Sequence, residues 1–146
     1  MELKEFLVRA KRATYANENA REKKIKGKGK LLMYSNRGLF YQDKYFGTNP
    51  FSGEEIIIKE GKVVWIMNYY GKTISKNSSK VYKFLRKALR KVDEDKPFRG
   101  PANFKEDDFR YINRFEGKID SFCGVEKISY KNRAVYFCYY HGGFVK

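Results

Sequence analysis

Apolar residues recur every three or four positions in two stretches of the chain, and this spacing predicts two amphipathic helices. The first stripe consists of Leu3, Phe6, Leu7, Ala10 and Ala13. The second stripe is more regular and consists of Val81, Phe84, Leu85, Ala88, Leu89 and Val92. It predicts a helix over residues 79–92, with Ser78 or Ser79 as its N-cap. Pro97 and Pro101 follow this helix, where proline cannot continue it.

Two β-hairpins are predicted where short turns separate segments of alternating apolar residues. Glu60-Gly61 and Lys131-Asn132 occupy the positions of two-residue turns. With these turns at the tips, Ile57 pairs with Val64 and Ile128 pairs with Val135. The same register pairs Glu55 with Ile66 and Glu126 with Phe137.

Alternation along the strands then assigns a face to each side chain. In the first hairpin, the face expected to meet the helices carries Glu55, Ile57, Val64 and Ile66. The opposite face of that hairpin carries Ile56, Ile58, Trp65 and Met67. In the second hairpin, the opposite face carries Lys127, Ser129, Tyr136 and Cys138.

The two hairpins also resemble each other in sequence when the chain is shifted by 71 residues without a gap. Seven identities fall in a 21-residue window, where about one is expected by chance. They align Phe51, Gly53, Glu55, Ile57, Val64, Tyr69 and Gly71 with Phe122, Gly124, Glu126, Ile128, Val135, Tyr140 and Gly142. Further upstream, Gly29 aligns with Gly100 and Phe40 with Tyr111. The pattern predicts one structural unit used twice, although any two hairpins share a similar alternation of apolar and polar residues.

The expected fold is α+β. It is a tandem-duplicated α-β(3-4) unit whose antiparallel sheet has pseudo-twofold symmetry and packs on two amphipathic helices. The 146 residues are interpreted as a single domain, 1–146, with repeats over about 1–74 and 75–146. With 42% apolar and 17% aromatic residues, the chain has enough hydrophobic side chains for a core.

The net charge of +15 is unevenly distributed. Residues 72–92 hold eight basic side chains and no acidic ones. A cationic helix face attracts polyanions, so nucleic acid is a candidate partner. The candidate polyanion-binding residues are Lys80, Lys83, Arg86, Lys87, Arg90 and Lys91, together with a Lys-rich arm over residues 23–30. A solvated helix face or a general bias in composition explains the same charges.

Several kinds of chemistry find no support in the sequence. The single histidine, His141, and the two cysteines form no metal-ligand spacing, so neither a metal nor a cofactor is expected. Cys123 and Cys138 are interpreted as small buried residues of a reducing compartment. No apolar run is long enough for a membrane span, and the first residues do not form a signal peptide. A cytoplasmic location and no membrane partner are expected.

Glu55 and Glu126 are the most informative polar residues, because both fall on a predicted apolar face. One interpretation is a structural acid that accepts hydrogen bonds from neighbouring groups. The other is a pair of polar anchors in a cleft between the repeats, with an unknown small molecule or protein as partner. The candidate ligand-binding residues are Glu55, Glu126, Trp65, Tyr69, Tyr136, Tyr140 and His141. The repeat by itself explains the two carboxylates, so no catalytic residues are assigned and the protein is interpreted as a non-enzyme. An enzyme acting through Glu55, Glu126 or His141 is the third and least favoured alternative.

A family resemblance extends over nearly the whole chain. The segments that carry it are Ala13-Thr14-Tyr15-Ala16, Tyr45-Phe46-Gly47, Phe51-x-Gly-Glu-Glu, Val64-Trp65-x-Met67-Asn68-Tyr69-Tyr70-Gly71, Phe98-Arg99-Gly100-Pro101 and His141-Gly142-Gly143. The chain resembles an uncharacterised prokaryotic domain family, found alone or behind an XRE-type helix-turn-helix in proteins described as transcriptional regulators. The resemblance brings no activity, cofactor or site residues, and the helix-turn-helix itself is missing here. It implies a regulatory or effector-binding domain, because duplicated α/β modules joined to DNA-binding domains are typical of effector-sensing regulators.

Overall fold

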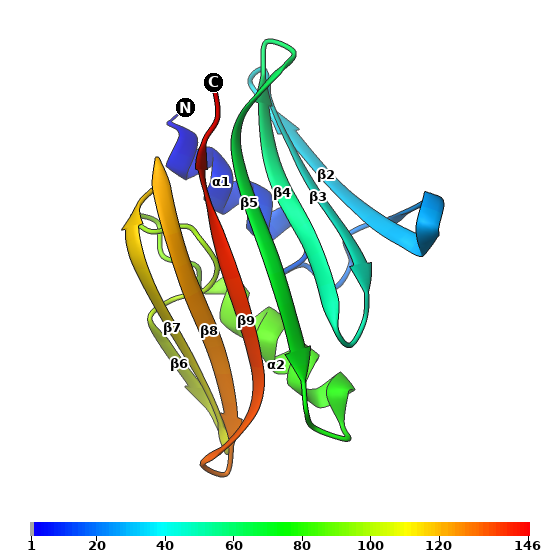
Figure 1. The fold of residues 1–146 in the computed structure, drawn as a ribbon, viewed down its shortest axis with the longest axis vertical. Helices are drawn as coiled ribbons and strands as arrows, with labels where there is room; N and C mark the ends of the chain where they lie inside the picture. Colours follow the sequence, from blue (N-terminus) through cyan, green and yellow to red (C-terminus); the bar gives the residue numbers. More distant parts are fainter. Residues whose placement is uncertain (1) are drawn as a thin grey trace.

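The computed structural model describes residues 2–146 as two helices packed on a nine-stranded antiparallel sheet (Figure 1). The helices are α1 (Leu3–Ala13) and α2 (Ser78–Arg90), with a short 3-10 turn at Lys26–Lys28. The strands are β1 (Lys23–Ile25), β2 (Gly29–Asn36), β3 (Leu39–Gly47), β4 (Phe51–Lys59), β5 (Lys62–Thr73), β6 (Asn103–Glu106), β7 (Phe109–Lys118), β8 (Ser121–Tyr130) and β9 (Arg133–Phe144). Their order in the sheet is β1-β2-β3-β4-β5-β9-β8-β7-β6. The fold is therefore α+β with an open antiparallel sheet.

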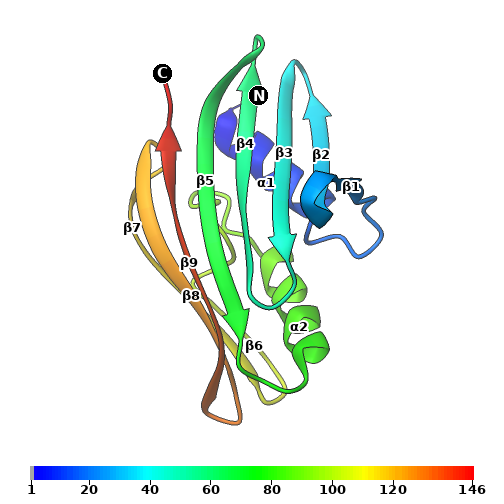
Figure 2. The same ribbon diagram turned by 45° about the vertical axis from the view of Figure 1, so that its right-hand side comes forward.

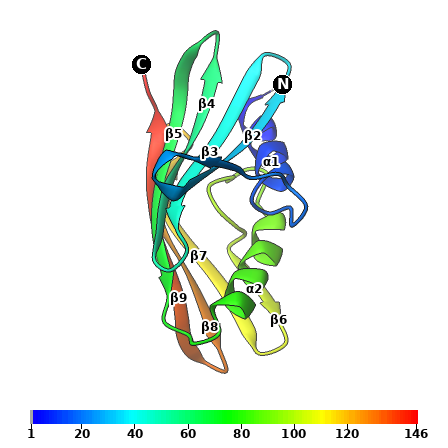
Figure 3. The same cartoon turned by 90° about the vertical axis from the view of Figure 1, so that its right-hand side faces the viewer.

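Both helices lie on the same side of the sheet, and Figures 2 and 3 show them from two further directions. Helix α1 packs on β2 through Phe6, whose ring centroid lies 5.6 Å from that of Tyr34. Helix α2 packs on β6 and β7 through Phe84, which stacks on Phe104 and Phe109 at 5.5 and 4.9 Å. No helix within residues 2–146 covers the other side of the sheet (Figure 3). The core thus forms one layer between the helices and one face of the sheet.

The two predicted helices are confirmed, and the predicted cap of the second is wrong. Helix α2 begins at Ser78, and its N-cap is Asn77, whose side-chain oxygen accepts a hydrogen bond from the backbone N–H of Lys80 at 3.2 Å. Asn77 occupies the cap because its short amide reaches the third helical N–H, which otherwise lacks an intrahelical partner. The helix also ends at Arg90, two residues earlier than expected.

Both predicted hairpin turns are confirmed. Glu60 and Gly61 have φ values of 51° and 76°, and Lys131 and Asn132 have φ values of 48° and 65°. Two successive positive φ values are characteristic of the type I′ turn, whose twist matches that of the adjoining strands.

The predicted register of the hairpins is wrong, because each contains a β-bulge. In the first hairpin Ile57 pairs with Trp65 and Ile58 with Val63, so Val64 is an extra residue in β5. The extra residue reverses the alternation beyond it, and Trp65 and Met67 are therefore buried while Val64 and Ile66 are only partly so. The second hairpin has the same irregularity, since Ile128 pairs with Tyr136 and Glu126 with Cys138.

The positions of the strands bear on the proposed repeat. Strands β5 and β9 lie 71 positions apart at both ends, as the alignment requires. Strands β3 and β7 are offset by 70 residues and not by the 71 of the alignment. Tyr41 pairs with Ile57, whereas Tyr111 pairs with Ile128. Three residues separate the paired Gly47 and Phe51, whereas four separate the equivalent pair Gly117 and Phe122, so Tyr41, not Phe40, corresponds to Tyr111. The duplication and its symmetry stay a prediction.

Two further expectations concern the cysteines and a membrane span. Cys138 is buried as predicted, but Cys123 is exposed, because it lies on the side of β8 that faces away from the helices. Neither helix of residues 2–146 has the length and apolar content needed to cross a bilayer.

Candidate functional site

Glu55 on β4 is buried under α1 and is fully engaged by neighbouring groups. The ammonium of Lys11 lies 2.8 and 2.7 Å from its two carboxylate oxygens, and the hydroxyl of Tyr41 donates a further hydrogen bond to it. Lys11 also donates to the carbonyl of Phe98 at 2.8 Å. Burial lowers the pKa of Lys11 and the adjacent Glu55 carboxylate opposes that effect. This carboxylate therefore joins α1, β3 and β4 in the core.

Glu126 on β8 is equally buried and has different partners. Arg99 donates to its Oε1 from Nη2 at 2.6 Å and from Nε at 3.1 Å. The hydroxyls of Tyr136 and Tyr111 donate to its two oxygens at 2.6 and 2.5 Å. Within residues 2–146, no buried side-chain nitrogen or oxygen lacks a hydrogen-bond partner. The contacts of Glu55 and Glu126 match the structural interpretation of both residues.

Asp43 is a third buried carboxylate, and the sequence analysis missed it. It lies on β3 directly opposite Glu55 and faces the helices. Burial, and next the nearby negative charge of Glu55, raise the pKa of Asp43 to about 7. The period-two pattern of Leu39, Tyr41, Asp43 and Tyr45 could have placed it on the buried face of the sheet.

Asp43 accepts a hydrogen bond from the hydroxyl of Tyr69 at 2.5 Å. In the other half of the sheet, the hydroxyl of Tyr140 donates in the same way to Asn113 at 2.7 Å. Each tyrosine ring needs a glycine beside it: an added Cβ would lie 2.6 Å from the Tyr69 hydroxyl at Gly53 and 2.3 Å from the Tyr140 ring at Gly124.

A pocket of about 320 Å³ opens beside Asp43, between α2 and the sheet. This volume is at the lower end of the usual range for small-molecule sites. Aromatic side chains make up much of its wall, and the guanidinium of Arg99 lies 5.3 Å from the ring centroid of Tyr69 at one side. The lining residues are Tyr15, Lys30, Asp43, Tyr45, Gly47, Thr48, Phe51, Tyr69, Ser78, Ser79, Tyr82, Arg86 and Arg99.

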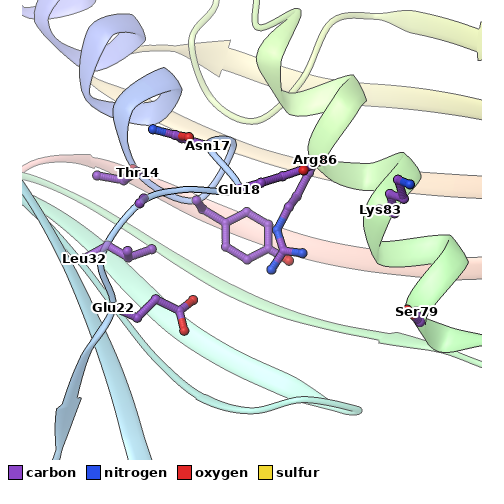
Figure 4. A pocket seen from close by; sticks show the side chains of 10 residues that line it. Thr14, Asn17, Glu18, Glu22, Leu32, Ser79, Lys83 and Arg86 are labelled. Carbon is purple, nitrogen blue, oxygen red and sulfur yellow. The ribbon is translucent and has the colours of Figure 1, made fainter.

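A second, wider pocket of about 510 Å³ adjoins the first, between α2 and the loop that follows α1 (Figure 4). Tyr15, Ser79 and Arg86 line both pockets. The guanidinium of Arg86 lies 5.0 Å from the ring centroid of Tyr15, so this cation–aromatic pair forms the boundary between them. Glu18 and Glu22 also line the wider pocket, where they pair with Arg90 and Lys30.

The three cations that line the smaller pocket differ in whether they form ion pairs within the protein. Lys30 forms an ion pair with Glu22 at 3.3 Å, and Arg99 forms one with Glu126 at 2.6 Å. Arg86 makes no ion pair within residues 2–146. It lies on the same side of the pocket as Ser78 and Ser79, the first two residues of α2. The positive end of the helix dipole and a guanidinium without an ion pair therefore line the same pocket.

The structure does not bring the seven predicted ligand-binding residues together. Tyr69 lines the 320 Å³ pocket, whereas Glu55 lines only a cavity of about 20 Å³, which has room for roughly one water molecule. Tyr136 and Tyr140 are buried and engaged as described above. Trp65 is buried with its indole N–H donating to the carbonyl of Ile119 at 3.1 Å, and His141 is exposed on the far face of the sheet.

The six predicted polyanion-binding residues all lie on or just after α2, but three have intramolecular partners. Lys87 pairs with Glu106 at 2.5 Å, Arg90 pairs with Glu18 at 3.0 Å, and Arg86 lies over Tyr15. The remaining three form no ion pair within residues 2–146; they are Lys80, Lys83 and Lys91. Among the described residues, no three His, Cys, Asp or Glu side chains gather to hold a metal ion.

A protein-family model matches most of the chain. The model of a family described as a domain of unknown function, DUF5680, matches residues 43–145. No curated protein and no solved structure matches the chain. The match extends from Asp43 through both hairpins, and it says nothing of helix-turn-helix domains or regulators. That part of the family resemblance stays a prediction.

Proposed function

The chain belongs to the DUF5680 family of domains of unknown function, and we propose that it is a non-enzymatic effector-binding domain whose ligand is a small aromatic carboxylate. The observation that supports this proposal most is the 320 Å³ pocket beside Asp43, which combines aromatic walls with a few convergent polar groups. A buried acid with a strongly raised pKa in such a cleft is a recognised sign of a binding site.

The aromatic part of the ligand follows from the walls of the pocket. Tyr15, Tyr45, Phe51, Tyr69 and Tyr82 present ring faces or edges from five different elements or loops. Phe51 and Tyr82 meet edge to face at 6.0 Å, and Tyr15 and Tyr45 do the same at 6.0 Å. Such rings favour a flat aromatic guest that stacks or meets them edge to face. A substituted benzoate is of suitable size for the volume.

The carboxylate part of the ligand follows from Arg86 and the beginning of α2. A carboxylate that enters between them gains a charge-assisted hydrogen bond from the guanidinium and a favourable interaction with the helix dipole. Arg86 would not have to break an ion pair to bind this carboxylate. Within residues 2–146 its guanidinium makes only a cation–π contact, with the ring of Tyr15. Lys30 and Arg99 also line the pocket, and each already has a carboxylate partner, so Arg86 is the cation that is free to pair with a ligand.

Asp43 supplies the hydrogen-bonding group at the inner end of the pocket. With a pKa of about 7 it is present both as acid and as carboxylate near neutral pH. It can therefore donate to or accept from a polar substituent on the ring. The Tyr69 hydroxyl fixes its orientation.

We further propose that the two halves of the chain are diverged copies and that only the first has kept a ligand pocket. The support is the equivalence of side-chain pairs: Tyr69 with Asp43 corresponds to Tyr140 with Asn113. Asn113 cannot ionise, and its side-chain NH₂ donates to the carbonyl of Gly100 at 3.0 Å, so the second half is closed by its own loop. Because α2 forms one wall of the pocket, occupation would change how α2 packs on the sheet. That change is the regulatory signal in this proposal.

The test uses ligand-observed NMR and calorimetry with benzoate, 4-hydroxybenzoate and indole-3-acetate as probes, and benzamide as the neutral analogue. We expect saturable binding of at least one acid and weaker binding of benzamide. Arg86→Gln should reduce the affinity for the acid about 10-fold, as loss of one charge-assisted hydrogen bond does, and abolish the preference over the amide. Ser79→Trp should fill the pocket and remove binding.

Two matched variants complete the design. Lys80→Gln removes the same charge from an exposed position of α2, and Ser35→Trp adds the same bulk on the exposed side of β2. Both should bind like the wild type. If all acids fail to bind at millimolar concentration, or if Ser79→Trp binds as well as Ser35→Trp, the pocket is not a site for this class of ligand.

A further inference from the structure

The uncovered face of the sheet carries exposed aromatic rings on its two central strands. Tyr70 on β5 and Tyr139 on β9 are directly opposite each other, and 47% and 57% of their surfaces are exposed. Phe137 packs beside Tyr139 with a centroid distance of 5.3 Å, and Phe46 lies further along the same cross-strand row. We call this side of strands β3 to β9 the open face. These exposed rings do not help to form the core, so packing of the core does not explain why aromatic residues occupy these positions.

Basic side chains surround these rings. The register places on the open face the cations Lys44, Lys72, Lys105, Arg110, Arg114, Lys118 and Lys127. The acids on the same face are Glu54 and Glu116. One of them is already used, because Glu54 pairs with Lys44 at 3.4 Å. Lys72 lies 5.5 Å from the ring centroid of Phe137, at the edge of the aromatic group.

We propose that the open face binds single-stranded nucleic acid, with bases stacked on Tyr70 and Tyr139 and phosphates contacted by the surrounding cations. Exposed rings on a sheet, alternating with basic residues, are the combination that single strands need: a platform for the bases and positive charge for the backbone. Adjacent strands lie about 4.8 Å apart, and Lys72 and Lys127 lie directly opposite Phe137, so these two cations are within one or two nucleotides of the rings.

The same observations disfavour other partners. A duplex hides the faces of its bases, so it could not use Tyr70 and Tyr139, and the open face carries no helix to enter a groove (Figure 3). A second copy of this chain would bring seven cations against seven others in a face-to-face dimer, in a protein of net charge +15. This site is also separate from the pocket proposed above, which lies on the helix side of the sheet.

The test is fluorescence anisotropy of labelled oligo(dT) and oligo(U) of about 15 nucleotides, a length suited to one domain. A duplex of the same length is the comparison. We expect saturable binding to the single strands, preference over the duplex, and marked weakening between about 50 and 200 mM salt. Tyr70→Ala and Tyr139→Ala should each weaken binding about 5- to 150-fold, as loss of one stacked base does. Tyr70→Phe with Tyr139→Phe keeps the rings and should retain binding.

Matched variants separate the open face from the rest of the surface. Lys72→Gln with Lys127→Gln should weaken binding and reduce its salt dependence, whereas Lys80→Gln with Lys91→Gln, near the two ends of α2, removes the same charge and should have a small effect. Ser79→Trp, which fills the pocket, should leave oligonucleotide binding unchanged. Circular dichroism and thermal unfolding establish that each variant is folded.

Three results would overturn the proposal. The first is no saturable binding of either single strand at low salt. The second is equal weakening by the α2 pair and the open-face pair, which would show that binding follows general charge. The third is a dimer in sedimentation equilibrium that Tyr70→Ala and Tyr139→Ala dissociate, which would make the open face a self-association surface.

Discussion

The hydroxyl of Tyr69 on β5 donates a hydrogen bond to Asp43 on β3 across the intervening strand β4, at 2.5 Å. Tyr140 on β9 makes the corresponding bond to Asn113 on β7 across β8, at 2.7 Å. The two bonds differ in one respect: the first acceptor can ionise and the second cannot. In the first half of the sheet, the stability of the fold therefore depends on pH through this residue.

Asp43→Asn should make the protein less sensitive to pH. Because the pKa of Asp43 is raised from 3.8 to about 7, its contribution is fully present below about pH 4 and is lost as pH rises toward 7. The unfolded chain ionises in that interval and the folded protein does not. Relative to the variant, the wild type should lose on the order of 4 kcal/mol of unfolding free energy between pH 4 and 7. Urea denaturation at several pH values measures this difference.

The control for that experiment is Asp107→Asn, an exposed aspartate in the turn between β6 and β7. It should follow the wild type at every pH. A difference between wild type and Asp43→Asn that stays constant from pH 4 to 7 would show that Asp43 keeps an ordinary pKa.

Trp65→Ala should destabilise the protein strongly, by about 3–5 kcal/mol, because the bulge at Val64 turns the indole into the core. Val64→Ala removes a half-buried side chain and should cost below about 1.5 kcal/mol. Trp65 is the only tryptophan, so its emission should lie at short wavelength in the folded protein and move to longer wavelength on unfolding. A hairpin without the bulge would give the opposite order of the two variants. Trp65→Phe, which keeps most of the volume, provides a measurable case if the alanine variant does not fold.

Glu126→Gln should cost about 3–5 kcal/mol of unfolding free energy. The reason is that the guanidinium of Arg99 is buried beside it and would lose its counter-charge. Glu106→Gln removes a comparable pair with Lys87 at a half-exposed position and should cost about 1 kcal/mol or less. Guanidinium chloride denaturation compares the two. Adding Arg99→Met to Glu126→Gln removes the unpaired charge and should recover part of the loss; a double variant less stable than Glu126→Gln would contradict this account.

The two thiols should differ in reactivity. Cys123 is exposed, whereas burial raises the pKa of the Cys138 thiol to about 12. A thiol-reactive dye at pH 8 should therefore label one cysteine per folded chain rapidly and both in denaturant. Cys123→Ser should abolish rapid labelling. Rapid labelling of that variant would mean that β9 opens readily from its neighbours.

Local sequence patterns were sufficient for the two helices, for the two hairpin turns and for the burial of Glu55 and Glu126. The helical spacing of Phe6 and Leu7, and of Phe84 and Leu85, predicted α1 and α2, because a helix must bury one face. Turn chemistry placed Glu60-Gly61 and Lys131-Asn132 at the hairpin tips. Glu55 and Glu126 each occupy an apolar position of an alternating strand pattern, and this predicted that both lie in the core.

Tertiary structure decided what those patterns could not. A single extra residue at Val64 reverses the faces of all residues beyond it, and nothing in the local pattern marks which residue is extra. Lys11 and Arg99 reach Glu55 and Glu126 from segments 44 and 27 residues away, so the partners of these acids depend on how the helices and loops close over the sheet. The pocket beside Asp43 has the same origin: it exists only where the first turn of α2 packs opposite β3, and strand alternation alone describes one wall of it.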